Sequence, residues 1–400
     1  MLSLELINYS LKNLWHNRSR SFLTIFSIFI GITTIFIFVS FGWGLYDYTN
    51  SFTTSSSVDK IVIQARGSSA PGLDNTFKLT DDDLEVVKKT DGVIEATGSY
   101  FRVAEIKKRE KIVYTFLASY DPEIPLMIEL GILKLQDGRW LRPGEKGGAV
   151  LGYNYMLEDK IFPEPYEIGD KIKVDGKDIK VIGILQSVGN PQDDAQIYIT
   201  NDYMKDLYEN ISYAMIVARV DVNNMQEIIE KVEKNLRNER NQEKGKEDFF
   251  VQSFEDLIAS FQTALNIIIG FVILIALISI VVSAINTANT MVTSVLERIK
   301  EIGIMKSVGA TNSEIFKIFL FESAFLGFIA GIFGTLSGWG LSHLAGVILD
   351  NLGWGFLSPH ISIYLFAGCI AFATLTGAVS GAWPAWQATR IKPVEALRYE

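Results

Sequence analysis

The amino-acid sequence predicts an α-helical membrane protein with four transmembrane helices and an α+β extracytoplasmic domain inserted between helices one and two. Three observations predict this architecture. Four long stretches carry no Asp, Glu, Lys or Arg, the 210 residues between the first two stretches are rich in charge, and short basic segments flank the stretches. A helix needs only ~20 apolar residues to cross a bilayer, so a fully soluble protein is excluded.

The four uncharged stretches are 26, 40, 27 and 39 residues long: Ser21–Tyr46, Leu257–Leu296, Ser323–Leu349 and Asn351–Thr389. The first is longer than the ~7–15-residue apolar core of a signal peptide and no A-x-A site follows it, so we predict an uncleaved membrane helix. As one helix, the second would extend about 60 Å, twice the ~30 Å hydrocarbon core. We therefore expect it to project beyond the membrane at one or both ends.

The basic residues of the short segments predict the topology. The N-terminal segment carries Lys12, Arg18 and Arg20, the loop after the second stretch and the C-terminal tail are also basic, and the outer loop Asp350–Ile361 has no Lys or Arg. Because Lys and Arg favour the cytoplasmic side, both termini are expected in the cytoplasm of a multi-pass cell-membrane protein, with the large domain outside. We predict an amphipathic N-terminal segment at 1–21, the first span at 22–46 and the outer domain at 47–256. The long second span with its stalk follows at 257–296, the cytoplasmic loop at 297–316 and the third span at 317–349. The outer loop is expected at 350–361, the fourth span at 362–384 and the tail at 385–400.

Small residues recur four apart in the last two spans, a spacing that lets helices approach closely in lipid. We favour packing within one chain over a dimer seam. The pairs are Gly327/Gly331, Gly334/Gly338 and Gly377/Gly381.

The outer segment reads as a folded domain. Thr80 is a plausible N-cap of a helix whose first turn is acidic, and Gly176 suits a tight turn between two strands. Loops are expected at 51–57 and 67–72, and a second helix at 222–240. Short strands are expected at 60–64, 172–174, 179–185, 196–200, 213–220 and 247–253.

The charge of the outer segment excludes some functions. Residues 47–256 hold 27 Lys and Arg against 38 Asp and Glu, a balance of −11, which argues against nucleic-acid binding. Asp81–Asp83 favours an acidic helix start over a cation site, and Asp193-Asp194 favours a solvated turn. We find no catalytic motif there, and we expect no catalytic, metal or cofactor site on this chain.

The cytoplasmic loop holds the clearest signal. Ile299, Ile302, Met305 and Val308 recur at helical spacing, and Val308-Gly309 should end the helix. Thr311-x-x-Glu314 fits a capping box for the third span. A short amphipathic helix is therefore expected between two spans. Such a helix either lies on lipid headgroups or docks into a partner protein.

Two charged features of this region carry alternatives. Arg298 and Glu301 lie three apart, where they can support each other or pair with a partner. Glu322 begins the third span, where a carboxylate is expensive. We favour an interfacial residue paired near the headgroups, whose change to Gln would leave coupling intact, over a partner for a cytoplasmic base.

The loop resembles the signature of the MacB/FtsX-like ABC transporter permeases, in Glu297-Arg298-x3-Ile302-Gly303-Ile304-x-Lys306-x2-Gly309-Ala310-Thr311 followed by Phe319–Glu322. The family's segment at the start of the first span is similar to Arg18–Thr24, and its C-terminal tail is similar to Pro384-Ala385 and Pro393-x2-Ala396. Its outer domain is similar to Gly138–Trp140 and Ile168–Asp170. By this resemblance, the loop is the coupling helix that contacts an ATPase. The implied interface residues are Glu297, Arg298, Glu301, Ile302, Gly303, Met305, Lys306 and Gly309.

The resemblance implies two permease subunits, as a homodimer or a related heterodimer, and a cytoplasmic ABC ATPase dimer. It implies an outer domain of two subdomains on helical stalks, moved by ATP hydrolysis while substrate stays outside the helices. The sequence has no G-x4-G-K-[ST] loop to cradle ATP phosphates, so ATP and magnesium are expected on a separate ATPase chain.

The function implied is export or extraction of an amphiphilic substrate, with membrane lipid and an extracytoplasmic adaptor or effector as further partners. The alternative is a signalling subunit that activates an outer partner such as a cell-wall hydrolase. A membrane anchor without an ATPase is disfavoured, because a simple anchor needs neither four spans nor a docking helix.

Overall fold

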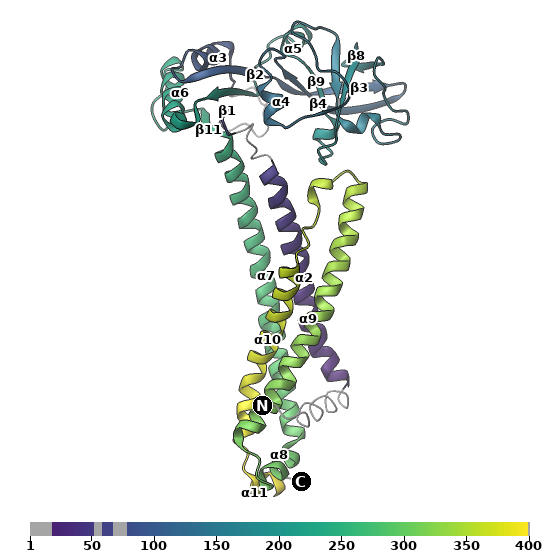
Figure 1. The fold of residues 1–400 in the computed structure, drawn as a ribbon, viewed down its shortest axis with the longest axis vertical. Helices are drawn as coiled ribbons and strands as arrows, with labels where there is room; N and C mark the ends of the chain where they lie inside the picture. Colours follow the sequence, from purple (N-terminus) through teal and green to yellow (C-terminus); the bar gives the residue numbers. More distant parts are fainter. Residues whose placement is uncertain (1–17, 52–57, 67–77, 399–400) are drawn as a thin grey trace. The chain divides into compact units, whose positions relative to one another are not determined.

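The computed structural model describes residues 18–51, 58–66 and 78–398 (Figure 1). The chain forms two compact units. The helical unit comprises the chain up to Leu45 with Ala264–Ile348 and the chain from Leu357, and the outer unit comprises Tyr46–Thr263 with Leu349–Phe356. Most of the expected N-terminal amphipathic segment and of the loops at 51–57 and 67–72 lies outside the described residues.

Four long helices bear out the four predicted spans. Each is long and apolar enough to cross a membrane. The second, of 44 residues, is one continuous helix and therefore longer than the bilayer core requires. The helical elements are α2 (Arg18–Ser51), α7 (Phe254–Glu297), α8 (Ile299–Ser307), α9 (Asn312–Asn351), the 3₁₀ turn η4 (Gly355–Leu357), α10 (Ile363–Thr389) and α11 (Pro393–Arg398).

The paired glycines of α9 and α10 pack inside the chain, as predicted. A Cβ atom on Gly327 would lie 2.4 Å from the carbonyl oxygen of Ala373, and one on Gly377 would lie 2.4 Å from that of Ser323. On α9, Gly334 and Gly338 face Ile32 and Phe36 of α2. Because no side chain separates the backbones of α9 and α10 at Gly327 and Gly377, these two helices approach closely without needing a hydrophobic driving force in lipid.

The outer unit is an α+β domain with two sheets. One has four antiparallel strands in the order β11-β1-β10-β2, and the other has seven in the order β5-β8-β6-β9-β4-β3-β7. The strands are β1 (Lys60–Ala65), β2 (Val93–Ser99), β3 (Phe101–Lys108), β4 (Lys111–Tyr120), β5 (Leu135–Gly138), β6 (Gly148–Leu151), β7 (Lys171–Val174), β8 (Lys177–Leu185), β9 (Ile197–Thr200), β10 (Met215–Val220) and β11 (Phe249–Ser253). The helices and 3₁₀ turns are α3 (Asp81–Lys88), α4 (Leu126–Leu130), η1 (Tyr153–Met156), η2 (Asp193–Ala195), α5 (Asn201–Leu207), η3 (Val222–Asn224) and α6 (Met225–Glu239).

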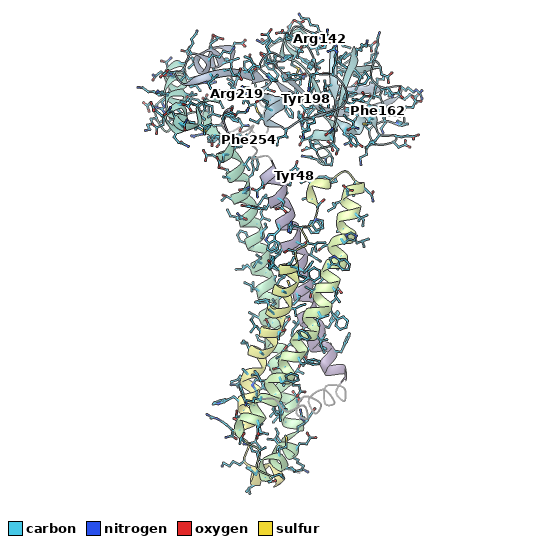
Figure 2. All side chains as sticks on the ribbon, in the orientation of Figure 1. Tyr48, Arg142, Phe162, Tyr198, Arg219 and Phe254 are labelled. Atoms are coloured by element: carbon cyan, nitrogen blue, oxygen red, sulfur yellow. The ribbon has the colours of Figure 1, made fainter. Side chains whose placement is uncertain are left out.

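Both faces of the four-stranded sheet are covered. Ile61 and Ile63 of β1 pack with α3 and α6, while Val62 between them packs with α4 and the start of α7 at Phe254. This alternation follows from the period of two along a strand. Figure 2 labels Phe254 and also Arg219 of β10, whose guanidinium pairs with Glu95 on the neighbouring strand.

The first strand of the domain pairs with the last. Ile61 is opposite Ser253 in the antiparallel β1–β11 ladder. The chain therefore enters and leaves this sheet on adjacent strands.

Two local predictions for the domain, the helix start at Thr80 and the turn at Gly176, are confirmed. Thr80 caps α3 in a capping box with Asp83, so the acidic run is a helix start. Asp83 also pairs with Arg240 at 2.7 Å. The turn at Gly176, with φ of +81°, connects β7 to β8.

The prediction of a solvated turn at Asp193-Asp194 is wrong. Asp194 is buried, and its carboxylate accepts hydrogen bonds from the Ser187 hydroxyl at 2.7 Å and the Val188 amide at 2.8 Å. Burial, followed by the neighbouring Asp194 charge, raises the pKa of Asp193 above its usual value. The two carboxyls thus hold the loop before β9 by hydrogen bonds, and of the two Asp194 is the buried one.

Candidate functional site

The loop between α7 and α9 folds as a short helix, α8, with defined ends. Arg298 occupies the N-cap position, and Val308 ends the helix before Gly309, whose φ of +107° suits a residue without a side chain. The Thr311 amide then donates to the Glu314 carboxylate at 2.8 Å, and the Glu314 amide donates back to the Thr311 hydroxyl. The predicted helix, its glycine stop and the capping box are confirmed.

The inner face of α8 belongs to the core of the helical unit. Ile302 is fully buried and packs in one cluster with side chains from the three long helices α7, α9 and α10. The other buried members are Met291, Val295, Ile315, Phe319, Ala385 and Ala388. A force on α8 is therefore received by the ends of three helices together, because a close-packed interior transmits strain.

A buried ion pair anchors the start of α8. Nη1 of Arg298 lies 3.1 Å from Oε2 of Glu322 on α9, and the two side chains are only 8% and 6% exposed. Nε of the same guanidinium donates to Glu301 at 3.1 Å, and its carbon lies 5.1 Å from the centre of the Phe319 ring. The expected mutual support of Arg298 and Glu301 is confirmed.

Of the two alternatives for Glu322, the contacts support the one that was not favoured, a partner for the base of the loop. Glu322 is buried within the chain, and its carboxylate pairs with Arg298 at the start of the loop between α7 and α9. Removing one member of a buried pair leaves an uncompensated charge. We therefore no longer expect a change of Glu322 to leave the loop unaffected.

The chain after α10 closes over α8. A Cβ atom on Gly303 would lie 2.6 Å from Cβ of Ala396 on α11, so only glycine allows this contact. The Lys306 ammonium donates to the carbonyl oxygens of Thr389 at 2.6 Å and Ile391 at 3.0 Å. These carbonyls end α10, where a cation is favourable.

The eight residues expected at the partner interface therefore divide. Glu297, Glu301 and Gly309 are exposed, and Met305 and Lys306 are half-buried. In contrast, Arg298, Ile302 and Gly303 are buried within the chain. Their placement on a contact surface is wrong, because Glu322, the helix core and α11 already cover them. These three residues position α8 from inside.

Two apolar residues of this region that are not among the eight expected interface residues are exposed. Ile304 is 54% exposed, and Val308, the last residue of the predicted apolar stripe, is 83% exposed, whereas Ile302 of the same stripe is buried. Lys300 is also exposed. Positions 300, 304 and 308 are four apart and share one face of a helix. We name Lys300, Glu301, Ile304 and Val308 the outer face of α8. This face lies on the side of α8 opposite to the buried Ile302, and that position is the signal that identifies it.

Two family models match the chain. The MacB-like periplasmic core domain matches residues 21–235, and the FtsX-like permease C-terminal domain matches residues 273–393. An uncharacterized ABC transporter permease of Methanocaldococcus jannaschii is 31% identical over 99% of this chain and 98% of its own length. The uncharacterized ABC transporter permease YknZ of Bacillus subtilis is 26% identical over the full length of both chains.

A longer relative and a solved domain are also similar. The macrolide export ATP-binding/permease protein MacB of Bdellovibrio bacteriovorus is 27% identical over 99% of this chain but only 62% of its own length. The crystal structure of the extracellular domain of YknZ from Gram-positive bacteria is 16% identical and covers 48% of this chain and 99% of that domain, with a TM-score of 0.39.

Proposed function

The chain belongs to the MacB/FtsX family of ABC transporter permeases, and from that premise we propose that it couples ATP hydrolysis on a separate cytoplasmic ATPase to motion of its outer domain. The observation that carries the proposal is α8. Its inner face is locked to three helices by Ile302 and the Arg298–Glu322 pair, while Ile304 and Val308 are left bare.

The composition of the outer face favours a protein partner over lipid headgroups. A helix that lies on a membrane turns a broad apolar face to the lipid and has a basic polar face. In α8 the broad apolar face is turned into the helix core, and the outer face has two apolar residues beside Lys300 and Glu301. A small apolar patch with a charged rim is typical of a protein interface.

The ATPase is proposed to be a separate chain that holds ATP and magnesium. The sequence lacks the phosphate-binding G-x4-G-K-[ST] loop. The MacB relative, named as an ATP-binding/permease protein, is longer than this chain, which covers only 62% of it. The remaining part of that relative, which this chain does not match, is long enough to hold the ATP-binding function in its name.

We propose export or extraction of an amphiphilic substrate as the work performed. Support comes from two relatives whose names state export, one of macrolides and one of pyoverdine. No observation favours the alternative of a signalling subunit that activates a cell-wall hydrolase. An extracytoplasmic adaptor and membrane lipid remain proposed partners.

We propose that two permease subunits, identical or related, act together. One α8 can serve one half of a two-fold ATPase, so closed symmetry calls for a second. α7 supports a seam between subunits, because only 17% of its most hydrophobic window is buried inside the chain. A second copy and lipid would share the uncovered side chains.

Purification in mild detergent tests the complex. We expect an ABC-type ATPase to co-purify with the tagged chain, and native mass spectrometry to count two permease and two ATPase subunits. A tagged membrane protein of an unrelated family, purified from the same cells, serves as the control for unspecific capture. A single permease chain bound to the ATPase would reject the paired arrangement.

Cysteine labelling in intact cells tests the topology. We expect an impermeant thiol reagent to modify a cysteine that replaces Lys177, since the domain that carries it is predicted outside by the distribution of Lys and Arg. A cysteine that replaces Lys300 should stay unmodified until the cells are opened. Both positions are exposed, and the native Cys369 is buried, so the parent chain is the control. The reverse pattern would overturn the topology.

A further inference from the structure

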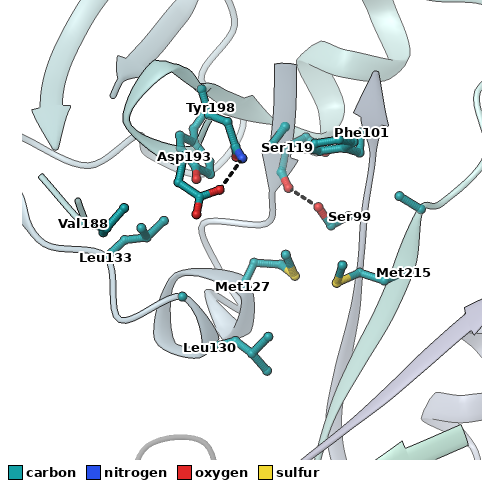
Figure 3. Close-up of a pocket in the computed structure, with 14 residues that line it drawn as sticks. Ser99, Phe101, Ser119, Met127, Leu130, Leu133, Val188, Asp193, Tyr198 and Met215 are labelled. Carbon is teal, nitrogen blue, oxygen red and sulfur yellow. Dashed lines mark hydrogen bonds between the residues drawn. The ribbon is translucent and has the colours of Figure 1, made fainter. Parts of the chain in front are cut away.

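The outer unit contains a cavity where its two sheets meet (Figure 3). Its volume is about 300 Å³. Ser99 and Met215 line it from the four-stranded sheet, Phe101 and Tyr198 from the seven-stranded sheet, and Met127 from α4. The volume falls at the lower end of the range of small-molecule sites, roughly 300–1,000 Å³.

The walls of the cavity are apolar and adaptable. Met127 and Met215 face each other across the space drawn in Figure 3, with Leu130 below Met127 and with Leu133 next to Val188 on the side of Asp193. Methionine is flexible and polarizable, and it accommodates apolar ligands of varied shape. The Ser99 hydroxyl in the wall donates to the Ser119 carbonyl oxygen at 2.6 Å, so that wall already satisfies its own polar group.

One end of the cavity is polar. Asp193 lines this end (Figure 3), and its carboxylate accepts hydrogen bonds from the Gln196 amide at 2.8 Å and the Asn190 amide at 2.9 Å. Asp194 lies beside it in the chain, and burial raises the pKa of Asp193. A cation or a hydrogen-bond donor placed against this carboxyl would offset the cost of burying its charged form, whereas a second acidic group or an anion would increase that cost.

We propose that this cavity binds the single apolar chain of an amphiphile, with an amine head group of that amphiphile at Asp193. The occupant is a long-chain amine rather than a fatty acid, because Asp193 is the one carboxyl among the described residues that line the cavity, and it would repel a second carboxylate. That such an amine is a substrate of the transporter rests on the proposed function. Binding itself needs no ATPase.

Photolabelling of the full chain in lipid nanodiscs, without ATPase, tests the proposal. The probe is decylamine with a diazirine in its chain, and labelled peptides are mapped by mass spectrometry. We expect labelling of the peptides that contain Met127 and Met215. Met127→Trp with Met215→Trp should reduce that labelling at least tenfold by filling the cavity. Ile94→Trp, at an exposed position of β2, is the matched control and should leave it unchanged.

A head-group comparison keeps the test decisive if the tryptophan variants fold poorly. The parent chain should be labelled several-fold more strongly by the decylamine probe than by a decanoate probe with the same diazirine. Asp193→Asn should remove that preference. Labelling that is equal for both probes in the parent chain, or that is confined to the membrane helices, would overturn the site. Since co-purification of the ATPase is measured separately, the site can fail while the coupling function stands, and the reverse.

Discussion

Glu322→Ala should lower the stability of the helical unit by about 3–5 kcal/mol, because it leaves the Arg298 guanidinium buried without its main counter-charge. The measurement is unfolding of the purified chain in detergent, followed by the signal of the helices. ATPase stimulation by the variant should fall with it, since the pair fixes the start of α8 to α9.

Two further variants separate the ion pair from a general effect of lost charge. Glu301 contacts the same arginine but is 54% exposed, so Glu301→Ala should cost only ~0.2–0.5 kcal/mol. Arg298→Met combined with Glu322→Leu should recover most of the stability, because apolar residues of similar volume can replace a buried pair. An equal loss for Glu301→Ala and Glu322→Ala would show that burial does not govern this cluster.

Gly377→Leu should disrupt the packing of α9 against α10 at a cost of about 1–3 kcal/mol or more. A Cβ atom at Gly377 would lie 2.4 Å from the Ser323 carbonyl oxygen and 3.1 Å from Cα of Gly327, and neither backbone can move without the helix. Thermal unfolding in detergent measures the change. The matched control is Gly368→Leu on the same helix, where no atom of the described chain lies within 4 Å of the Cβ position. If the two variants unfold at the same temperature, close helix contact at Gly377 is not a source of stability.

The membrane helices could be predicted because charge is excluded from lipid along a continuous run of sequence. The strands predicted at 60–64 and 179–185 are β1 and β8, which extend over 60–65 and 177–185, and they could be predicted because their patterns and turns are local. In contrast, β2 to β6 and the helices α4 and α5 were missed. The order of the seven-stranded sheet depends on pairings such as β4 with β9, whose partners Leu117 and Ile197 lie 80 residues apart. No local pattern encodes such a pairing.

The same distinction governs the candidate site. The spacing of Arg298 and Glu301, and that of Thr311 and Glu314, could be read within one helical turn. The burial of Arg298 depends on Glu322, 24 residues away, and that of Gly303 depends on Ala396 on α11. Three of the eight residues expected to touch a partner, Arg298, Ile302 and Gly303, are therefore internal, and the outer face of α8 was recognised only from the structure.

Docking of the outer face of α8 on the ATPase is the central claim, and one comparison tests it most directly. Ile304→Asp with Val308→Asp is introduced into the full chain, and co-purification of the ATPase and its stimulation in nanodiscs are measured against Ile94→Asp, an exposed residue of the outer domain. Because both changed side chains point away from the core, the double variant should insert and fold normally. A charge forced into a desolvated interface costs several kcal/mol, so ATPase association should weaken at least ~100-fold while the control stays unchanged. Association and stimulation at the parent level in the double variant would contradict the claim and return α8 to the lipid surface.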